Sequence, residues 1–135
     1  MKIDGACHCG RIAFEAEVNP DQIGVCHCTD CQTLTGSAFR ANIQAPAASF
    51  VRRGIEPKIY IKTAESGAKR AHAFCPECGT PLYATAAEGA PTLYSLRVGT
   101  IRQRHEFSAP VLQLWCDSAL PWSMHMDSVR KLARQ

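Results

Sequence analysis

The sequence predicts a mostly β fold with little helix. Short segments in which apolar and polar residues alternate recur along the chain, and glycine or proline separates most of them. Several short strands at this spacing are typical of an all-β or mostly β protein. With 135 residues, no linker and no internal repeat, residues 1–135 are expected to form a single domain.

Six segments are expected to be strands, because each alternates or is rich in residues that favour β-structure. In the first, every second residue from Ile12 to Val18 is apolar, so one face should be buried. In the second, the alternation runs through Phe39, Ala41, Ile43 and Ala45. The expected strands are residues 11–18, 38–45, 58–62, 81–86, 92–98 and 111–115.

Helix is expected in two short places. Residues 29–35 should form one or two turns that end at Gly36. Residues 127–134 should form a short C-terminal helix with Asp127 as its N-cap.

Charge and hydropathy disfavour several classes of function. The net charge is +3 and the fifteen Lys and Arg residues are scattered, so a nucleic-acid partner is not expected. No stretch reaches the ~18 apolar residues of a membrane span, and no apolar run follows Met1 and Lys2 as in a signal peptide. A cytoplasmic protein is therefore expected. In that reducing compartment, clustered cysteines bind metal more often than they form disulfides.

Seven of the eight cysteines fall into three clusters. The first and third clusters, Cys-x-Cys and Cys-x-x-Cys, together supply four thiolates, enough to close a tetrahedral zinc site. Each pair precedes a glycine, Gly10 or Gly79, which tolerates the positive φ of a zinc-binding turn. Disulfides or free thiols are the alternative, although a disulfide within Cys-x-Cys is strained, and iron is a less favoured metal. The predicted ligands of this structural zinc are Cys7, Cys9, Cys75 and Cys78.

The second cluster supplies three thiolates and leaves one coordination position free. Zinc held by three protein ligands is usually catalytic, so Cys26, Cys28 and Cys31 are the candidate catalytic ligands. In an extended backbone Cys26 and Cys28 point the same way and His27 points away. The alternative is a closed site with a distant fourth ligand; otherwise Cys116 is expected to be a buried free cysteine. The candidate fourth ligands are Cys116, His27, His72, His105 and His125.

The cysteine motifs occur in a specific order: CHCG, then CHCTDCQTLTGSAF, then FCPECGTPLY, then WCDSALPW. This order resembles the glutathione-dependent formaldehyde-activating enzyme family, which includes centromere protein V, and the similarity runs from Cys7 to Trp122. The resemblance implies zinc-tethered small antiparallel sheets, called a β-tent and similar to a zinc ribbon. It also implies two zinc ions per chain, a structural one on the four cysteines and a more loosely held catalytic one on the three.

The resemblance also implies an activity. The family's reaction is the condensation of formaldehyde with glutathione to S-hydroxymethylglutathione, which makes the protein a zinc-dependent carbon–sulfur lyase type of enzyme. Its partners would be a small-molecule thiol, such as glutathione, and a small aldehyde. One departure from the family pattern concerns His72, because the family often has an arginine at this position.

The three-thiolate site suggests a mechanism in which a substrate thiol enters the free position, loses its proton and adds to the aldehyde carbon. Thr29, Asp30 or Ser37 could relay a proton, although helix-capping or turn roles are the simpler interpretation. Several arginines are available for the carboxylates of glutathione, each of them expected to be mainly solvated. They are Arg40, Arg52, Arg53, Arg70 and Arg97.

Two other classes of function remain open. A zinc-stabilised module without catalysis could bind protein or nucleic acid, although no basic stripe interleaves with aromatic residues. Redox chemistry is the other, with a thiol of the three-cysteine cluster as the reactive group and Cys116 as its resolving partner.

Overall fold

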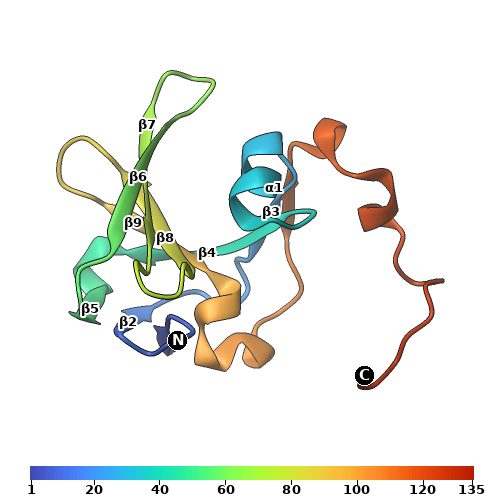
Figure 1. Cartoon of the computed structure of the whole chain (residues 1–135), viewed down its shortest axis with the longest axis horizontal. Coiled ribbons are helices and arrows are strands. Elements are labelled where there is room, and N and C mark those ends of the chain that lie inside the picture. Colours follow the sequence, from blue (N-terminus) through green and yellow to red (C-terminus); the bar gives the residue numbers. More distant parts are fainter.

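Two β-sheets form the body of the protein (Figure 1). The computed structural model describes residues 1–135 and contains ten strands and one α-helix. The smaller sheet is antiparallel, in the order β1-β2-β5. Its strands are β1 (Lys2–Ala6), β2 (Ile12–Glu17) and β5 (Val51–Gly54).

The larger sheet has seven strands in the order β10-β3-β4-β9-β8-β7-β6. Its pairs are antiparallel except at one edge, where β10 runs parallel to β3. The smaller sheet therefore agrees with the expectation of small antiparallel sheets. The larger sheet differs from it in having seven strands and one parallel pair. The strands are β3 (Gly24–Cys26), β4 (Arg40–Pro46), β6 (Lys58–Thr63), β7 (Lys69–Phe74), β8 (Pro81–Ala86), β9 (Leu93–Arg97) and β10 (Leu112–Leu114).

Helix is short. The α-helix α1 (Thr29–Thr35) ends at Gly36, whose φ of 62° is left-handed and whose N–H closes the last turn. The 3₁₀ turns are η1 (Ala47–Ser49), η2 (Val98–Thr100), η3 (Arg102–Glu106), η4 (Cys116–Ser118) and η5 (Pro121–Met124).

The hydrophobic core lies between one face of β2 and one face of the larger sheet. Ile12 and Phe14 are buried, as the alternation of β2 predicts, and they join the same cluster as Ile43 and Leu96. Ile43 pairs with Leu96 across β4 and β9, and residues in register share a face. Each large apolar side chain that is fully buried here contributes about 2 kcal/mol.

The opposite face of the larger sheet is polar. Register places Cys26 beside Arg40, Asn42 beside Arg97, and Gln44 beside Ser95. The helix α1 follows β3 and contacts β4. Its Asp30 forms an ion pair of 2.9 Å with Lys62 on the far edge strand β6. The polar face therefore carries α1 and, as shown below, the second cysteine cluster.

The six strands predicted from the sequence are all present, with ends that differ by a few residues. Four more strands, β1, β3, β5 and β7, were not predictable from alternation, because they are short or carry glycine or charged residues. The alternation expected in β4 is correct for Ile43 and Ala45, which are buried. It fails at the strand's start, where Phe39 is 40% exposed and Arg40 only 5% exposed.

The predicted C-terminal helix is wrong. Residues 127–134 contain only turns, bends and irregular backbone, and every residue from 124 onward is exposed. The backbone hydrogen bonds in this part of the chain are local, such as the one from Val129 N to Met126 O. Because a helix this short needs tertiary packing to be stable, and nothing packs on it, none forms. In Figure 1 this segment, coloured red, leads away from the sheets.

None of the helices is both long and apolar enough to span a membrane.

Removal of residues 126–135 should leave the stability of the protein almost unchanged, because all of these residues are exposed. The thermal midpoint should stay within about 2 °C of that of the full chain. Differential scanning calorimetry of the two proteins measures this. Deletion of 111–135 is the control, because it also removes β10 and its pairing with β3, and it should lower the midpoint far more.

Candidate metal centres

The first group of cysteines gathers four sulfurs at one point. Cys7 and Cys9 lie in the turn between β1 and β2, while Cys75 and Cys78 lie in the turn between β7 and β8. All four sulfurs lie within 4.8 Å of one another. The turns close in the way that the glycines predict, with φ of 78° at Gly10 and 75° at Gly79.

The sulfur spacing fits a tetrahedral metal. Cys7 Sγ lies 3.5 Å from Cys9 Sγ, and Cys9 Sγ lies 3.7 Å from Cys75 Sγ. Four sulfurs at ~2.3 Å from zinc would stand ~3.8 Å apart. Backbone groups already support the sulfurs, since Ile12 N donates to Cys7 Sγ at 3.3 Å. The four residues could therefore hold a zinc ion with little rearrangement.

This group joins the two sheets. Cys7 and Cys9 belong to a hairpin of the smaller sheet, and Cys75 and Cys78 to a hairpin of the larger one. Thr80 adds a second link that sequence reasoning missed. Its Oγ1 accepts a hydrogen bond from His8 N at 3.0 Å and lies 3.1 Å from Cys78 Sγ. Its place directly after Cys-x-x-Cys-Gly was the available signal. The Thr80 hydroxyl, the largest influence, lowers the pKa of the Cys78 thiol to about 5.

The second group contains Cys26, Cys28 and Cys31, whose sulfurs also lie within 4.8 Å of one another. Cys26 ends β3, Cys28 is the N-cap of α1, and Cys31 lies in the first turn of the helix. The Cys28 sulfur accepts a hydrogen bond from Cys31 N at 3.3 Å, as a serine or aspartate cap would. The strand-to-helix turn thus brings the three sulfurs together.

No fourth side chain joins these three sulfurs. Cys116, the first candidate, is exposed rather than buried, and its Sγ faces Gln113 O at 3.8 Å. His27 is buried and its Nε2 lies 2.9 Å from Gln113 Oε1. The other three candidate histidines, His72, His105 and His125, also lie outside the group. A metal held here would have three protein ligands.

Burial disfavours the negatively charged thiolate form of these cysteines, so nearby positive charge is needed to stabilise it. Burial raises the pKa of the Cys31 thiol to about 12, and Arg40 acts in the opposite direction. A buried thiol of this kind becomes a thiolate when a metal ion replaces its proton. The chemistry of the residues therefore suits a metal ion such as zinc.

Two arginines that were expected to be solvated are buried next to this site. Arg40 is 5% exposed and Arg97 is 7% exposed. Both face His72: Arg97 Nη2 lies 3.2 Å, and Arg40 Nη1 3.5 Å, from His72 Nδ1. A guanidinium has no acceptor, so His72 Nδ1 must carry the lone pair and the ring must be the neutral Nε2–H tautomer.

Two of the remaining arginines and the polar candidates have structural partners, whereas Arg70 on β7 is half-buried and forms none of the protein's ion pairs. Arg53 pairs with Glu15, and Arg52 pairs with Glu56, both away from the polar face. Thr29 and Asp30 lie in the first turn of α1, where the Cys28 sulfur, not Thr29, is the cap. Ser37 N donates to Thr35 Oγ1 after the helix. These contacts agree with the interpretation of Thr29, Asp30 and Ser37 as helix-end residues.

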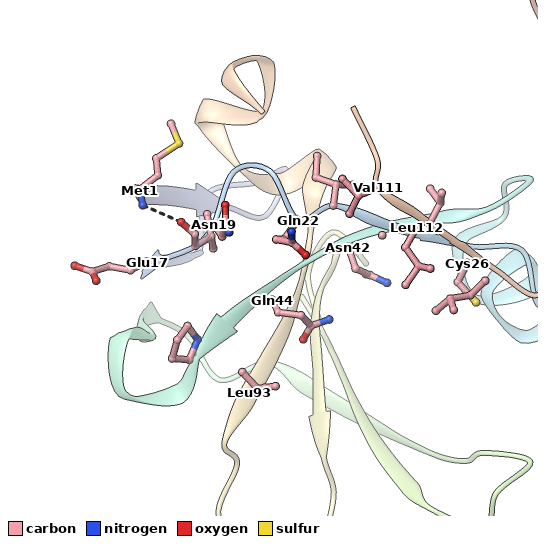
Figure 2. A pocket seen from close by; sticks show the side chains of 16 residues that line it. Met1, Glu17, Asn19, Gln22, Cys26, Asn42, Gln44, Leu93, Val111 and Leu112 are labelled. Atoms are coloured by element: carbon pink, nitrogen blue, oxygen red, sulfur yellow. Dashed lines mark hydrogen bonds between the residues drawn. The ribbon is translucent and has the colours of Figure 1, made fainter. Parts of the chain in front are cut away.

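A groove of about 650 Å³ lies beside the second group, and its lining includes Cys26 (Figure 2). Its lining combines apolar residues such as Val111 and Leu112 with the amides of Gln22, Asn42 and Gln44. Cys26 lies at one end of the labelled residues in Figure 2. No lysine or arginine lines this groove; its charged groups are the Glu17 carboxylate and the Met1 ammonium, which donates to Val18 O.

Comparison with protein families identifies the chain. Residues 2–118 match the model of the family described as glutathione-dependent formaldehyde-activating enzyme. The chain belongs to this family.

Other comparisons are sparse. No curated protein matches the chain. Four solved chains match, and one of them is the crystal structure of a Rhodobacter sphaeroides protein. It superposes with a TM-score of 0.60 at 21% sequence identity, over 79% of this chain and 97% of that one. At this identity the similarity supports the fold alone.

Membership of the glutathione-dependent formaldehyde-activating enzyme family links the chain to glutathione and formaldehyde chemistry. Both cysteine groups lie within the matched residues. The structure also shows what His72 does where the resemblance led us to expect an arginine. Its ring accepts hydrogen bonds from two guanidiniums, which a third arginine could not do.

Replacement of Thr80 by valine should weaken zinc binding at the four-cysteine group about tenfold, as loss of a group that supports a ligand commonly does. Thr80→Ser should retain the affinity, because the hydroxyl is kept. Competition with a chromophoric chelator measures both affinities. Equal affinities for the valine and serine variants would show that the hydroxyl is irrelevant.

His72 should stay neutral in mildly acidic solution. Burial, followed by the charges of Arg97 and Arg40, lowers its pKa to about 4. The unfolded chain takes up this proton near pH ~6.5 but the folded protein does not, so stability falls as the pH drops from there towards 4. Nitrogen-15 NMR of the ring at pH ~5 should show the neutral Nε2–H form. The same ring in urea should be protonated, and a protonated ring in the folded state would contradict the geometry.

Proposed function

We propose that the protein is a zinc-dependent enzyme of the carbon–sulfur lyase type, which promotes the addition of a thiol to a small carbonyl compound. The thiol is glutathione or a similar molecule, and the carbonyl is formaldehyde or another small aldehyde. The observation that carries this proposal is the group of Cys26, Cys28 and Cys31, which offers three sulfurs and no fourth ligand. Family membership supports the choice of glutathione and formaldehyde.

The proposal assigns different roles to the two cysteine groups. Cys7, Cys9, Cys75 and Cys78 would hold a structural zinc between the two sheets. Cys26, Cys28 and Cys31 would hold the second, catalytic zinc more loosely. The same tether supports the proposal that residues 1–135 form one domain, because it connects turns 66 residues apart. We further propose a cytoplasmic location, since thiolate ligands need a reducing compartment.

Zinc held by Cys26, Cys28 and Cys31 would supply a Lewis acid that lowers the pKa of a substrate thiol, whose proton would pass to solvent. The chain's own residues prepare the surroundings of that position. Arg40 and Arg97 place positive charge on the same sheet face as Cys26, which favours an anionic sulfur. The thiolate would then add to the aldehyde carbon, forming the carbon–sulfur bond as the carbonyl π bond breaks, and the resulting alkoxide would take a proton from solvent.

The activity test compares exchange in mixtures of formaldehyde and glutathione with and without the zinc-loaded protein. Carbon-13 exchange NMR should show faster formation and breakdown of S-hydroxymethylglutathione in its presence. An exchange rate equal to the uncatalysed one across the physiological pH range would reject the glutathione–formaldehyde assignment.

Cys28→Ser is the informative variant, because serine is itself a favoured N-cap and should preserve α1. The zinc content should fall from two ions per chain towards one, the circular dichroism should stay unchanged, and the exchange should lose its acceleration. Cys116→Ser is the matched control and should keep both zinc ions and the activity. Unfolding of the Cys28→Ser protein would mean that the second site is structural.

A further inference from the structure

Arg40 and Arg97 are two buried cations without a carboxylate partner. Both are more than nine-tenths buried, and the ion pairs of the protein are made by other residues. A buried guanidinium is costly unless an anion compensates it. The proximity of the two positive charges adds to the cost, and burial followed by the charge of Arg40 lowers the pKa of Arg97 to about 9.

Neutral groups hold the two guanidiniums in place without neutralising them. Arg97 Nη1 donates to Asn42 Oδ1 at 2.6 Å, and its Nη2 faces His72 Nδ1. The Nε atoms of Arg40 and Arg97 are buried and have no hydrogen-bond partner. Unpaired buried donors of this kind are rare in folded proteins and call for a partner. The two guanidiniums are therefore oriented by neutral partners but are not electrostatically compensated.

The cysteines of the second group do not balance this charge. Three thiolates with one divalent zinc ion carry a net charge of −1, whereas the two guanidiniums carry +2. Lys62 and Asp30 pair with each other and cancel. His72 is neutral. Arg70 lies on the same face of β7 as His72 and adds a further positive charge, and it forms none of the protein's ion pairs. This face of the sheet therefore lacks at least one negative charge.

A cavity provides room for an anion at this place. It measures about 300 Å³, and its lining includes Arg40, His72 and Arg97 together with Leu34 and Tyr60. A second cavity of about 450 Å³ shares Arg40 and Arg97 with it. The larger groove of Figure 2 lacks lysine and arginine, and its one cation, the Met1 ammonium, shares the lining with the Glu17 carboxylate. An anion is therefore better matched by the arginine pair.

We propose that Arg40, Arg97 and His72 form a subsite that binds a carboxylate of the substrate. His72 contributes as a neutral acceptor that holds the two guanidiniums together. Arg40 lies opposite Cys26 in the β3–β4 register, so the carboxylate would bind close to the sulfur site. The inference rests on the proposed function only in taking this carboxylate to belong to a substrate. The carboxylate could come from the thiol or from the carbonyl compound.

The binding test uses wild-type zinc-loaded protein and a ligand that cannot react. S-Methylglutathione keeps both carboxylates but has no free thiol, so neither metal ligation nor turnover is needed for it to bind. The Nε–H NMR signals of Arg40 and Arg97 should shift on titration with S-methylglutathione and should not shift with its dimethyl ester. A parallel titration compares glyoxylate with glycolaldehyde, which lacks the carboxylate. Shifts with glyoxylate alone would retain the subsite and assign the carboxylate to the carbonyl partner.

Variants supply the energetic test. Arg97→Gln should raise the dissociation constant by about tenfold or more for whichever carboxylate ligand shifts the signals of the wild-type protein. The reason is that a charged hydrogen bond is lost. Arg53→Gln, an exposed arginine on the smaller sheet, should leave it unchanged. If no carboxylate shifts the two arginine signals in the wild-type protein, the subsite is disproved whether or not the variant folds. Because no reaction is involved, this result is independent of the formaldehyde–glutathione exchange assay.

Discussion

The contact between two cysteine-bearing turns is the constraint on which the rest of this structure depends. One turn closes the β1–β2 hairpin of the smaller sheet, and the other closes the β7–β8 hairpin of the larger one. Their four sulfurs meet at a point, and Thr80 connects the turns a second time through His8 N. Metal binding at such a point becomes folding free energy, of the order of 10 kcal/mol for structural zinc in small peptides. That is comparable to the stability of a whole domain.

Because the smaller sheet is held against one face of the larger sheet, the two faces of the larger sheet have different environments. The face towards β2 is packed with Ile43 and Leu96 and carries the hydrophobic core. The other face does not form part of the hydrophobic core and carries polar side chains, including Asn42, Arg97 and Ser95. Because residues alternate between faces along a strand, a single strand such as β4 can serve the core and the site at once.

The polar face concentrates positive charge beside thiols that need it. Buried arginines are costly, and their presence without carboxylate partners indicates that stability alone did not select them. The charge of Arg40 favours the thiolate form of Cys31, and the charges of both arginines favour any anion that enters the adjoining cavity. His72 allows the two guanidiniums to approach each other, because its neutral nitrogen accepts from both. The sulfur site and the arginine pair thus form one electrostatic unit.

The sequence by itself determined the mostly β fold, six of the strands, the helix α1 and the grouping of seven cysteines. These features depend on local spacing. Alternation marks a strand such as β2, and a separation of one or two residues between cysteines is enough for a turn to bring the sulfurs together. Only the tertiary structure decided which residues surround the second cysteine group. The burial of Arg40 and Arg97 follows from the pairing of β4 with β3 and with β9, and β9 is distant from β4 in sequence. The exposure of Cys116 and the absence of helix after Asp127 have the same origin, because a residue is buried or a short helix stabilised only when another part of the chain packs against it.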